Sequence, residues 1–207
     1  MRKLKKIVSY SLVTAAMGAL AAGVVNMPGI LAYMTDGGAI TNTMTVGENE
    51  IEVVEDFQKP TIQIGENTFR KDVKVKNTGD VPCYVRVFLE FSDDDVRNES
   101  KVSADGATFY TIGEFNSHLP SGWVYVSGSS DELAPYYYYT SPLEVGESTP
   151  SLLKTVKTTF ATQDVIEPFD IYVYAESVQT LDKYGQEFTG TNQWRSAWSE
   201  YLGVDAG

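Results

Sequence analysis

The chain has 207 residues, of which 28 are acidic and 16 basic, so its formal net charge is −12 with the single histidine neutral. Such an acidic surface repels phosphate backbones, which argues against nucleic-acid binding. The only cysteine, Cys83, has no partner for an intrachain disulfide. The length fits one domain with a sizeable core.

The N-terminus has the composition of a targeting segment. Four basic residues stand within the first six positions, and the next 19 residues, 7–25, carry no charge. A basic start followed by an apolar run and a small residue at the cut is typical of a secretory signal peptide. We therefore expect residues 1–32 to form a signal helix and residues 33–207 to form the exported domain.

The signal predicts cleavage between Ala32 and Tyr33. A run of 19 residues is also long enough to cross a bilayer, which needs roughly 17–25 residues, so a retained membrane anchor is the alternative. Five Ser, Thr and Gly residues dilute the run and favour cleavage. After cleavage, 12 basic and 28 acidic residues would remain, a formal charge of −16, which keeps monomers soluble and makes association sensitive to salt.

Beyond the signal, apolar and polar residues alternate with a period of two. Val73 and Val75, and then every second residue from Cys83 to Phe91, are apolar, as expected of half-buried strands. The sequence Asn-Thr-Gly-Asp at 77–80 is a turn signal. We expect residues 69–91 to form two antiparallel strands joined by this turn.

Further segments rich in Val, Ile, Thr and Tyr predict strands, with Gly and Pro between them. They lie at 51–53, 123–126, 136–139, 152–160 and 169–178. Residues 192–202 place apolar side chains at helical spacing and predict a short C-terminal helix. The expected fold class is all-β, a jelly-roll-like β-sandwich in a single domain.

Several short motifs resemble those of the TasA/camelysin group of exported bacterial proteins, which a dedicated signal peptidase of the SipW type processes. Residues 31–36 and 42–47 resemble that group's signal junction and first strand, and 75–79 with 84–87 its strand, Asn-Thr-Gly turn and second strand. Later segments are similar to other blocks of its members: 136–139, 143–149, 175–179 and 197–198. The likeness spans most of the chain.

The resemblance implies a secreted or surface-associated subunit of a biofilm-matrix fibre, in which the freed N-terminal segment adds as a strand to a neighbouring subunit. The residues allow this on their own. The segment 33–46 has no Pro, one charge and many β-formers, so it suits addition to an open sheet edge. By the period of two, one face carries Ile40, Asn42, Met44 and Val46. The alternative is that this segment forms the first strand of its own sandwich.

Catalysis is not expected. Camelysin-type relatives have been described as metalloproteases, but zinc proteases of the HExxH kind need two histidines on a helix, and this chain has only His118. Cys83 falls on the apolar phase of a strand, which favours a buried thiol over a nucleophile. We therefore expect no enzyme activity, no cofactor and no metal.

Two further patterns leave alternatives open. The acidic run 93–95 is either a solvated loop or an oxygen-rich calcium site. The tyrosine run 136–139 either packs structurally or forms a carbohydrate platform, although in a strand at most two of its rings share one face. A monomeric module that binds carbohydrate or another surface component is thus the alternative to a fibre subunit.

Overall fold

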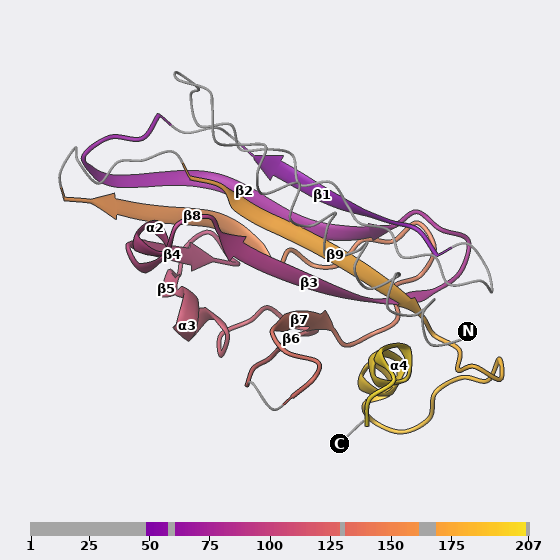
Figure 1. The fold of residues 1–207 in the computed structure, drawn as a ribbon. Helices are drawn as coiled ribbons and strands as arrows, with labels where there is room; N and C mark the ends of the chain where they lie inside the picture. Colours follow the sequence, from indigo (N-terminus) through magenta and orange to yellow (C-terminus); the bar gives the residue numbers. More distant parts are fainter. Residues whose placement is uncertain (1–48, 58–60, 129–130, 162–168, 206–207) are drawn as a thin grey trace, which may run out of the picture. The chain divides into compact units, whose positions relative to one another are not determined.

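The computed structural model describes residues 49–57, 61–128, 131–161 and 169–205, all within one compact unit. In these ranges the chain forms two antiparallel sheets packed face to face, with a short helix near the C-terminus (Figure 1). The predicted all-β sandwich is confirmed.

Five strands form the first sheet, in the order β1 (Ile51–Phe57), β2 (Gly65–Asn77), β8 (Leu153–Phe160), β4 (Ser100–Ser103) and β5 (Tyr110–Thr111). Four strands form the second, in the order β6 (Trp123–Val126), β7 (Tyr136–Tyr139), β3 (Cys83–Phe91) and β9 (Ile171–Gln179). The helices described are α2 (Asp94–Asn98), α3 (Ile112–Phe115) and α4 (Gln193–Leu202).

The core lies between the sheets and is built by the alternation that the sequence shows. Val73 and Val75 of β2 meet Val85 and Val87 of β3 in one apolar cluster, and all four are 0% exposed. Burying an aliphatic side chain of this size contributes about 1.5–3 kcal/mol. Packing and strand pairing, without a disulfide, therefore account for the fold of the described residues, whose one cysteine is free.

The predicted hairpin over residues 69–91 is wrong, because β2 and β3 lie in different sheets. The side chain of Asn77, 0% exposed, donates from Nδ2 to the carbonyls of Val81 (2.8 Å) and Leu143 (2.9 Å). Pro82 has no N–H to extend a ladder. The turn therefore carries the chain across the sandwich, and the apolar faces of both strands meet in the core.

The segment 143–152 joins the two sheets. Leu143 exchanges backbone hydrogen bonds with Cys83 of β3 (3.2 and 2.8 Å). A few residues later, the N–H of Thr149 donates to Val75 of β2 (2.8 Å) and that of Leu152 donates to Val73 (2.9 Å). This crossing fixes the start of β3 against the end of β2.

Four short elements, β4, β5, α2 and α3, were not predicted. The acidic run begins α2 instead of forming a loop, because Asp93 Oδ1 accepts a hydrogen bond from the N–H of Val96 (2.8 Å) and caps the helix. The predicted C-terminal helix is present as α4, which ends at Gly203 in the left-handed conformation (φ 72°).

Candidate functional site

The residues predicted for processing and assembly lie outside the described part of the chain. These are Ala32 and Tyr33 at the proposed cleavage site, and Ile40, Asn42, Met44 and Val46 of the proposed assembly strand. Strand donation also needs an acceptor, which would be a sheet edge whose backbone groups point outward. The described residues are compared with this requirement below.

The outer edge of β1 is the first candidate. Asn77, the β2 residue opposite Ile51, donates its N–H to Glu147 and accepts from the N–H of Gly146, both at 2.9 Å. Two residues opposite each other in an antiparallel pair either bond to each other or both point their N–H and C=O groups away from each other. Asn77 points its groups away from β1. The N–H and C=O of Ile51 therefore point away from β2.

The same geometry repeats along β1. Val75 accepts from the N–H of Thr149 and lies opposite Val53, and Val73 accepts from the N–H of Leu152 and lies opposite Glu55. Among the described residues, no strand is hydrogen-bonded to the outer side of β1. β1 thus offers a row of backbone donors and acceptors at every second residue.

β9 forms a second edge, on the other sheet. Cys83 directs its N–H and C=O to Leu143, so the backbone groups of Gln179, its partner on β9, point away from β3. β1 and β9 are close in space, yet no ladder between them occurs in the described ranges. The two edges therefore lie on the same side of the sandwich.

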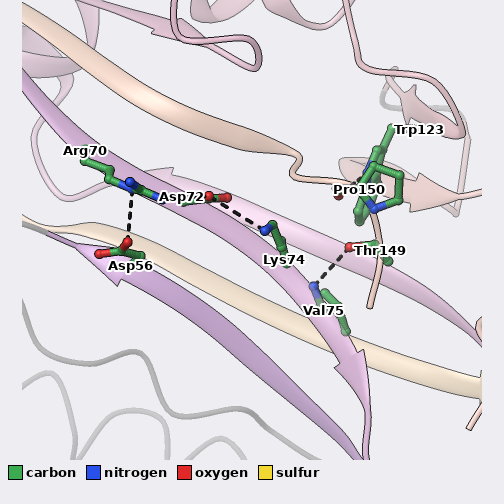
Figure 2. A network of polar contacts seen from close by, with 8 residues as sticks. All are labelled: Asp56, Arg70, Asp72, Lys74, Val75, Trp123, Thr149 and Pro150. Carbon is green, nitrogen blue, oxygen red and sulfur yellow. Dashed lines mark hydrogen bonds and ion pairs between the residues drawn. The ribbon is translucent and has the colours of Figure 1, made fainter. Parts of the chain in front are cut away.

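Charges surround the β1 edge. Figure 2 shows Arg70 of β2 reaching across to Asp56 of β1, with Nε and Oδ2 3.1 Å apart, and Lys74 Nζ 3.8 Å from Asp72 Oδ2. On the core side, Lys71 Nζ lies 3.1 Å from both carboxylate oxygens of Glu55. Inward charges on an edge strand restrict indiscriminate pairing with other strands.

The close-up also shows how the crossing segment is fixed. The N–H of Val75 donates to Thr149 Oγ1 at 3.1 Å, and the indole Nε1 of Trp123 donates to the carbonyl of Pro150 at 3.1 Å (Figure 2). Trp123 belongs to β6 of the second sheet and Val75 to β2 of the first. These bonds hold the two sheets in register behind the open edges.

The outer face of the second sheet is covered in part by α4, through Arg86. The guanidinium lies 3.9 Å from the ring centre of Tyr136 and 4.2 Å from that of Trp198, and its Nε donates to Glu176 (2.6 Å). The pKa of Arg86 is raised: burial disfavours the charge, but its bonds to Tyr138 and Glu176 outweigh burial. This buried cation fixes α4 to the sheet.

The tyrosine run divides between the two faces of β7, as predicted. Tyr137 points inward and donates its hydroxyl to Asn116 Oδ1 (2.6 Å), and Tyr139 packs against Trp123 with ring centres 5.5 Å apart. Tyr136 and Tyr138 lie on the outer face, where Tyr138 is 0% exposed beside the rings of α4. Only Tyr136 of this pair reaches the surface.

The residues weighed for chemistry are not assembled into a site. Cys83 is 0% exposed, and burial raises the pKa of its thiol to about 12, which keeps it protonated. His118 lies on the surface, where its ring stacks on Tyr110 at 4.3 Å and Nδ1 lies 2.8 Å from the carbonyl oxygen of Glu114. In the part of the chain that the structure describes, no hydrogen bond or ring contact links Cys83 to His118, and no cluster of three or more His, Cys, Asp or Glu side chains suits a metal.

Comparisons with known proteins give no relative: the chain matches no protein-family model, no curated protein and no solved structure. Among the described residues, no helix has the length and apolar character needed to cross a bilayer.

Proposed function

We propose that this protein is an exported, non-catalytic structural subunit that assembles into fibres by donating its N-terminal strand to a neighbouring copy. The observation that carries the proposal is the outer edge of β1, where the backbone groups of Ile51, Val53 and Glu55 face away from β2. An added strand would satisfy these groups and continue the first sheet.

The proposed donor segment has matching chemistry. Residues 33–46 are free of Pro, so every N–H after the first is able to join a ladder, and Asp36 is their only charge. Ile40, Met44 and Val46 share one face and would anchor the strand, with Asn42 between them. Thr41, Thr43 and Thr45 would occupy the other face.

The entry to β1 fixes where the donor segment would leave the domain. The carbonyl of Glu50 accepts hydrogen bonds from the N–H groups of Thr78 and Gly79, both at 2.9 Å. This anchors the residue before β1 to the turn at the end of the sandwich. The donor segment would leave the domain at this turn, from where it would either fold back onto its own β1 through a hairpin or extend to a neighbouring copy.

The proposal of export rests on the sequence of the signal segment. Residues 1–32 would direct the chain across the membrane, and a SipW-type signal peptidase would release it between Ala32 and Tyr33. The protein would then act outside the cell or at its surface. Self-association of this acidic chain would depend on salt, because like-charged copies repel one another at low ionic strength.

A second candidate function is a monomeric glycan-binding module, favoured by one observation. Half-buried aromatic rings cross the outer face of the second sheet: Tyr136 and Phe88 have ring centres 5.7 Å apart, and Phe88 and Tyr174 have ring centres 6.4 Å apart. A row of rings presents apolar faces on which sugars stack. A monomeric module of this kind would bind glycans without forming filaments.

Electron microscopy of residues 33–207 at several salt concentrations tests the proposal. We expect filaments from this protein and none after deletion of residues 33–46. Met44→Asp should also prevent filaments, because a buried unpaired charge costs several kcal/mol, whereas the control Thr43→Asp on the opposite face should retain them. A protein that stays monomeric at every salt concentration would contradict the fibre reading and leave the glycan-binding module.

A further inference from the structure

The ladder between β3 and β7 stops before β3 does. β3 continues to Phe91, but it pairs with β7 only at Arg86 and Val87. Pro135, the residue before β7, has no N–H with which to extend the ladder. Among the described residues, the last part of β3, residues 88–91, therefore pairs with a strand on one side only, namely β9.

The pairing with β9 shows where the backbone groups of this open side point. The N–H of Ser92 donates to the carbonyl of Asp170 at 2.9 Å, so the even-numbered residues of β3 bond to β9. Cys83, an odd-numbered residue, directs its groups to the other side. The N–H and C=O of Leu89 and Phe91 therefore point away from β9, and in the described part of the chain no ladder partner lies opposite them there.

A hollow of about 200 Å³ lies along this open edge, and we call it the β3 notch. Four consecutive residues of β3, 88–91, line it. Neighbouring side chains of a strand point to opposite faces, so a hollow that touches all four residues lies at the edge of the strand. The notch therefore places a cavity beside free backbone donors and acceptors.

The inner wall of the β3 notch is apolar and fixed. Tyr125 and Tyr137 line it with ring centres 4.7 Å apart, together with the buried side chain of Ile112. The hydroxyl of Tyr137 donates to Asn116 Oδ1 at 2.6 Å, which holds the ring in place. A cavity of about 150 Å³ accommodates a benzene ring, so the notch has room for one large apolar side chain.

The rim of the β3 notch carries three exposed charged side chains, Glu90, Asp94 and Arg97. Two carboxylates against one guanidinium give the rim a formal charge of −1. The chain as a whole carries −12. Both values disfavour an acidic ligand and suit one that is neutral or basic.

We propose that the β3 notch binds a short extended peptide, which adds as an antiparallel strand beside Leu89 and Phe91 and places one aromatic or large aliphatic side chain in the cavity. A residue opposite Leu89 would bond to it and would have its side chain on the same face. Strand addition obtains affinity from such main-chain bonds and specificity from a pocket for a side chain. The free groups recur at every second residue, as in a strand, which favours a peptide over a sugar chain.

The β3 notch serves a different partner from the β1 edge. It lies on the β7 side of β3, whereas β9 lies on the other side of β3 and β1 belongs to the other sheet. Its open edge has four residues, roughly 13 Å at 3.3 Å per residue, which suits a shorter segment than residues 33–46. The site thus goes beyond the proposed fibre function and does not require it.

Binding of the full chain to the end-blocked peptide Lys-Thr-Val-Phe-Val-Thr-Lys tests the proposal. Replacing the central Phe by Ala should weaken binding about tenfold or more, because less apolar surface is buried. N-methylation of this Phe should prevent binding, since its N–H would donate to β3. N-methylation of a neighbouring Val, whose N–H would point away from β3, should have little effect.

Variants of the protein locate the peptide. Glu90→Lys changes the rim charge from −1 to +1 and should weaken binding about three- to tenfold at low salt. Glu52→Lys makes the same change of charge at an exposed position of β1 and should leave the affinity unchanged. Tyr125→Ala removes part of the wall and should also weaken binding, whereas Tyr184→Ala, at a side chain 77% exposed, should not.

Equal binding of the Phe and Ala peptides, or of the two N-methylated peptides, would overturn the proposal, because it would show that neither the cavity nor a strand recognises the ligand. A loss in Glu52→Lys instead of Glu90→Lys would place the peptide at the β1 edge and overturn the assignment to the notch. Tighter binding of maltotriose than of the peptide would overturn it in favour of a sugar site. Micrographs of the same samples separate the two proposals: filaments without peptide binding contradict only the notch, and peptide binding without filaments contradicts only the fibre function.

Discussion

The guanidinium of Arg86 and the indole of Trp198 lie 4.2 Å apart, which joins the second sheet to the C-terminal helix through one cation. Arg86 also donates to Glu176 and to Tyr138, so its removal would leave the Glu176 carboxylate without its cation and the Tyr138 hydroxyl with only its bond to Leu133. These contacts compensate the charge of Arg86, which allows the side chain to be buried.

Arg86→Ala should lower the free energy of unfolding by about 3 kcal/mol, because breaking a buried ion pair strands the remaining charge. Arg195→Ala is the control. Arg195 pairs with Asp131 at 2.7 Å, but both side chains are about a quarter exposed, so its loss should cost roughly 1 kcal/mol or less. Denaturant unfolding measures both values, and equal losses would contradict the role assigned to Arg86.

Asn77→Asp should destabilise the fold by about 3 kcal/mol, since it replaces two buried N–H donors by an acceptor that faces the carbonyls of Val81 and Leu143. Asn98→Asp makes the same chemical change at an exposed position on α2 and should have little effect. Thermal melting of the two variants checks the prediction. A stable Asn77→Asp would mean that the crossing between the sheets does not depend on this amide.

The loop of residues 105–108 should lose stability in acid through Asp105. Hydrogen bonds from the backbone of Thr108 and Ala107, and from the hydroxyls of Ser103 and Thr108, hold the pKa of Asp105 well below its usual value. A depressed folded-state pKa stabilises the fold above the unfolded value, near 3.9, and this contribution is lost as the pH falls further. Asp105→Asn should therefore lower the melting temperature at pH 7.

The difference between Asp105→Asn and the parent protein should shrink as the pH falls below about 4. Melting curves from pH 7 to pH 2 provide the measurement. Asp94, an exposed acid in the first turn of α2, serves as the comparison through Asp94→Asn. A difference for Asp105→Asn that is the same at pH 7 and pH 2 would show that ionisation of Asp105 has no part in it.

Cys83 should not react with a thiol reagent in the native protein and should react once the chain is unfolded in denaturant, because its thiol is buried and protonated. Cys83→Ala should still fold cooperatively, with a loss of about 1–2 kcal/mol from the space left. Rapid labelling of the native protein would contradict the burial of the Cys83 thiol.

Protein cleavage that is lost in His118→Ala would contradict the hypothesis that the protein is non-catalytic.

Alternation in the sequence predicts β2 and β3, and the content of Val, Ile, Thr and Tyr predicts β8 and β9. Of β1 (Ile51–Phe57), only residues 51–53 are predicted. β6 and β7 were also placed correctly over Trp123–Val126 and Tyr136–Tyr139. β4 and β5, of four and two residues, carry too little pattern to be read. The turn at 77–80 shows that the chain reverses but does not show which sheet it enters, since that depends on the contact of Asn77 with Leu143, 66 residues away.

The candidate assembly site is also only partly predictable from the sequence. The composition of 33–46 indicates a donor strand, but the acceptor edge emerges only once Asn77 and Val75 are seen to bond to the segment 146–149. No local pattern in the sequence identifies this edge, because it is created by the order of strands in the first sheet.

Hydrogen exchange at β1 tests strand donation most directly. The account predicts that the backbone N–H groups of Ile51, Val53 and Glu55 exchange rapidly in the variant that lacks residues 33–46 and become strongly protected in filaments of residues 33–207. The N–H groups of Glu52 and Val54, which face β2, should be protected in both. Filaments in which the amides of Ile51 and Val53 still exchange as fast as in the deletion variant would contradict strand addition at β1.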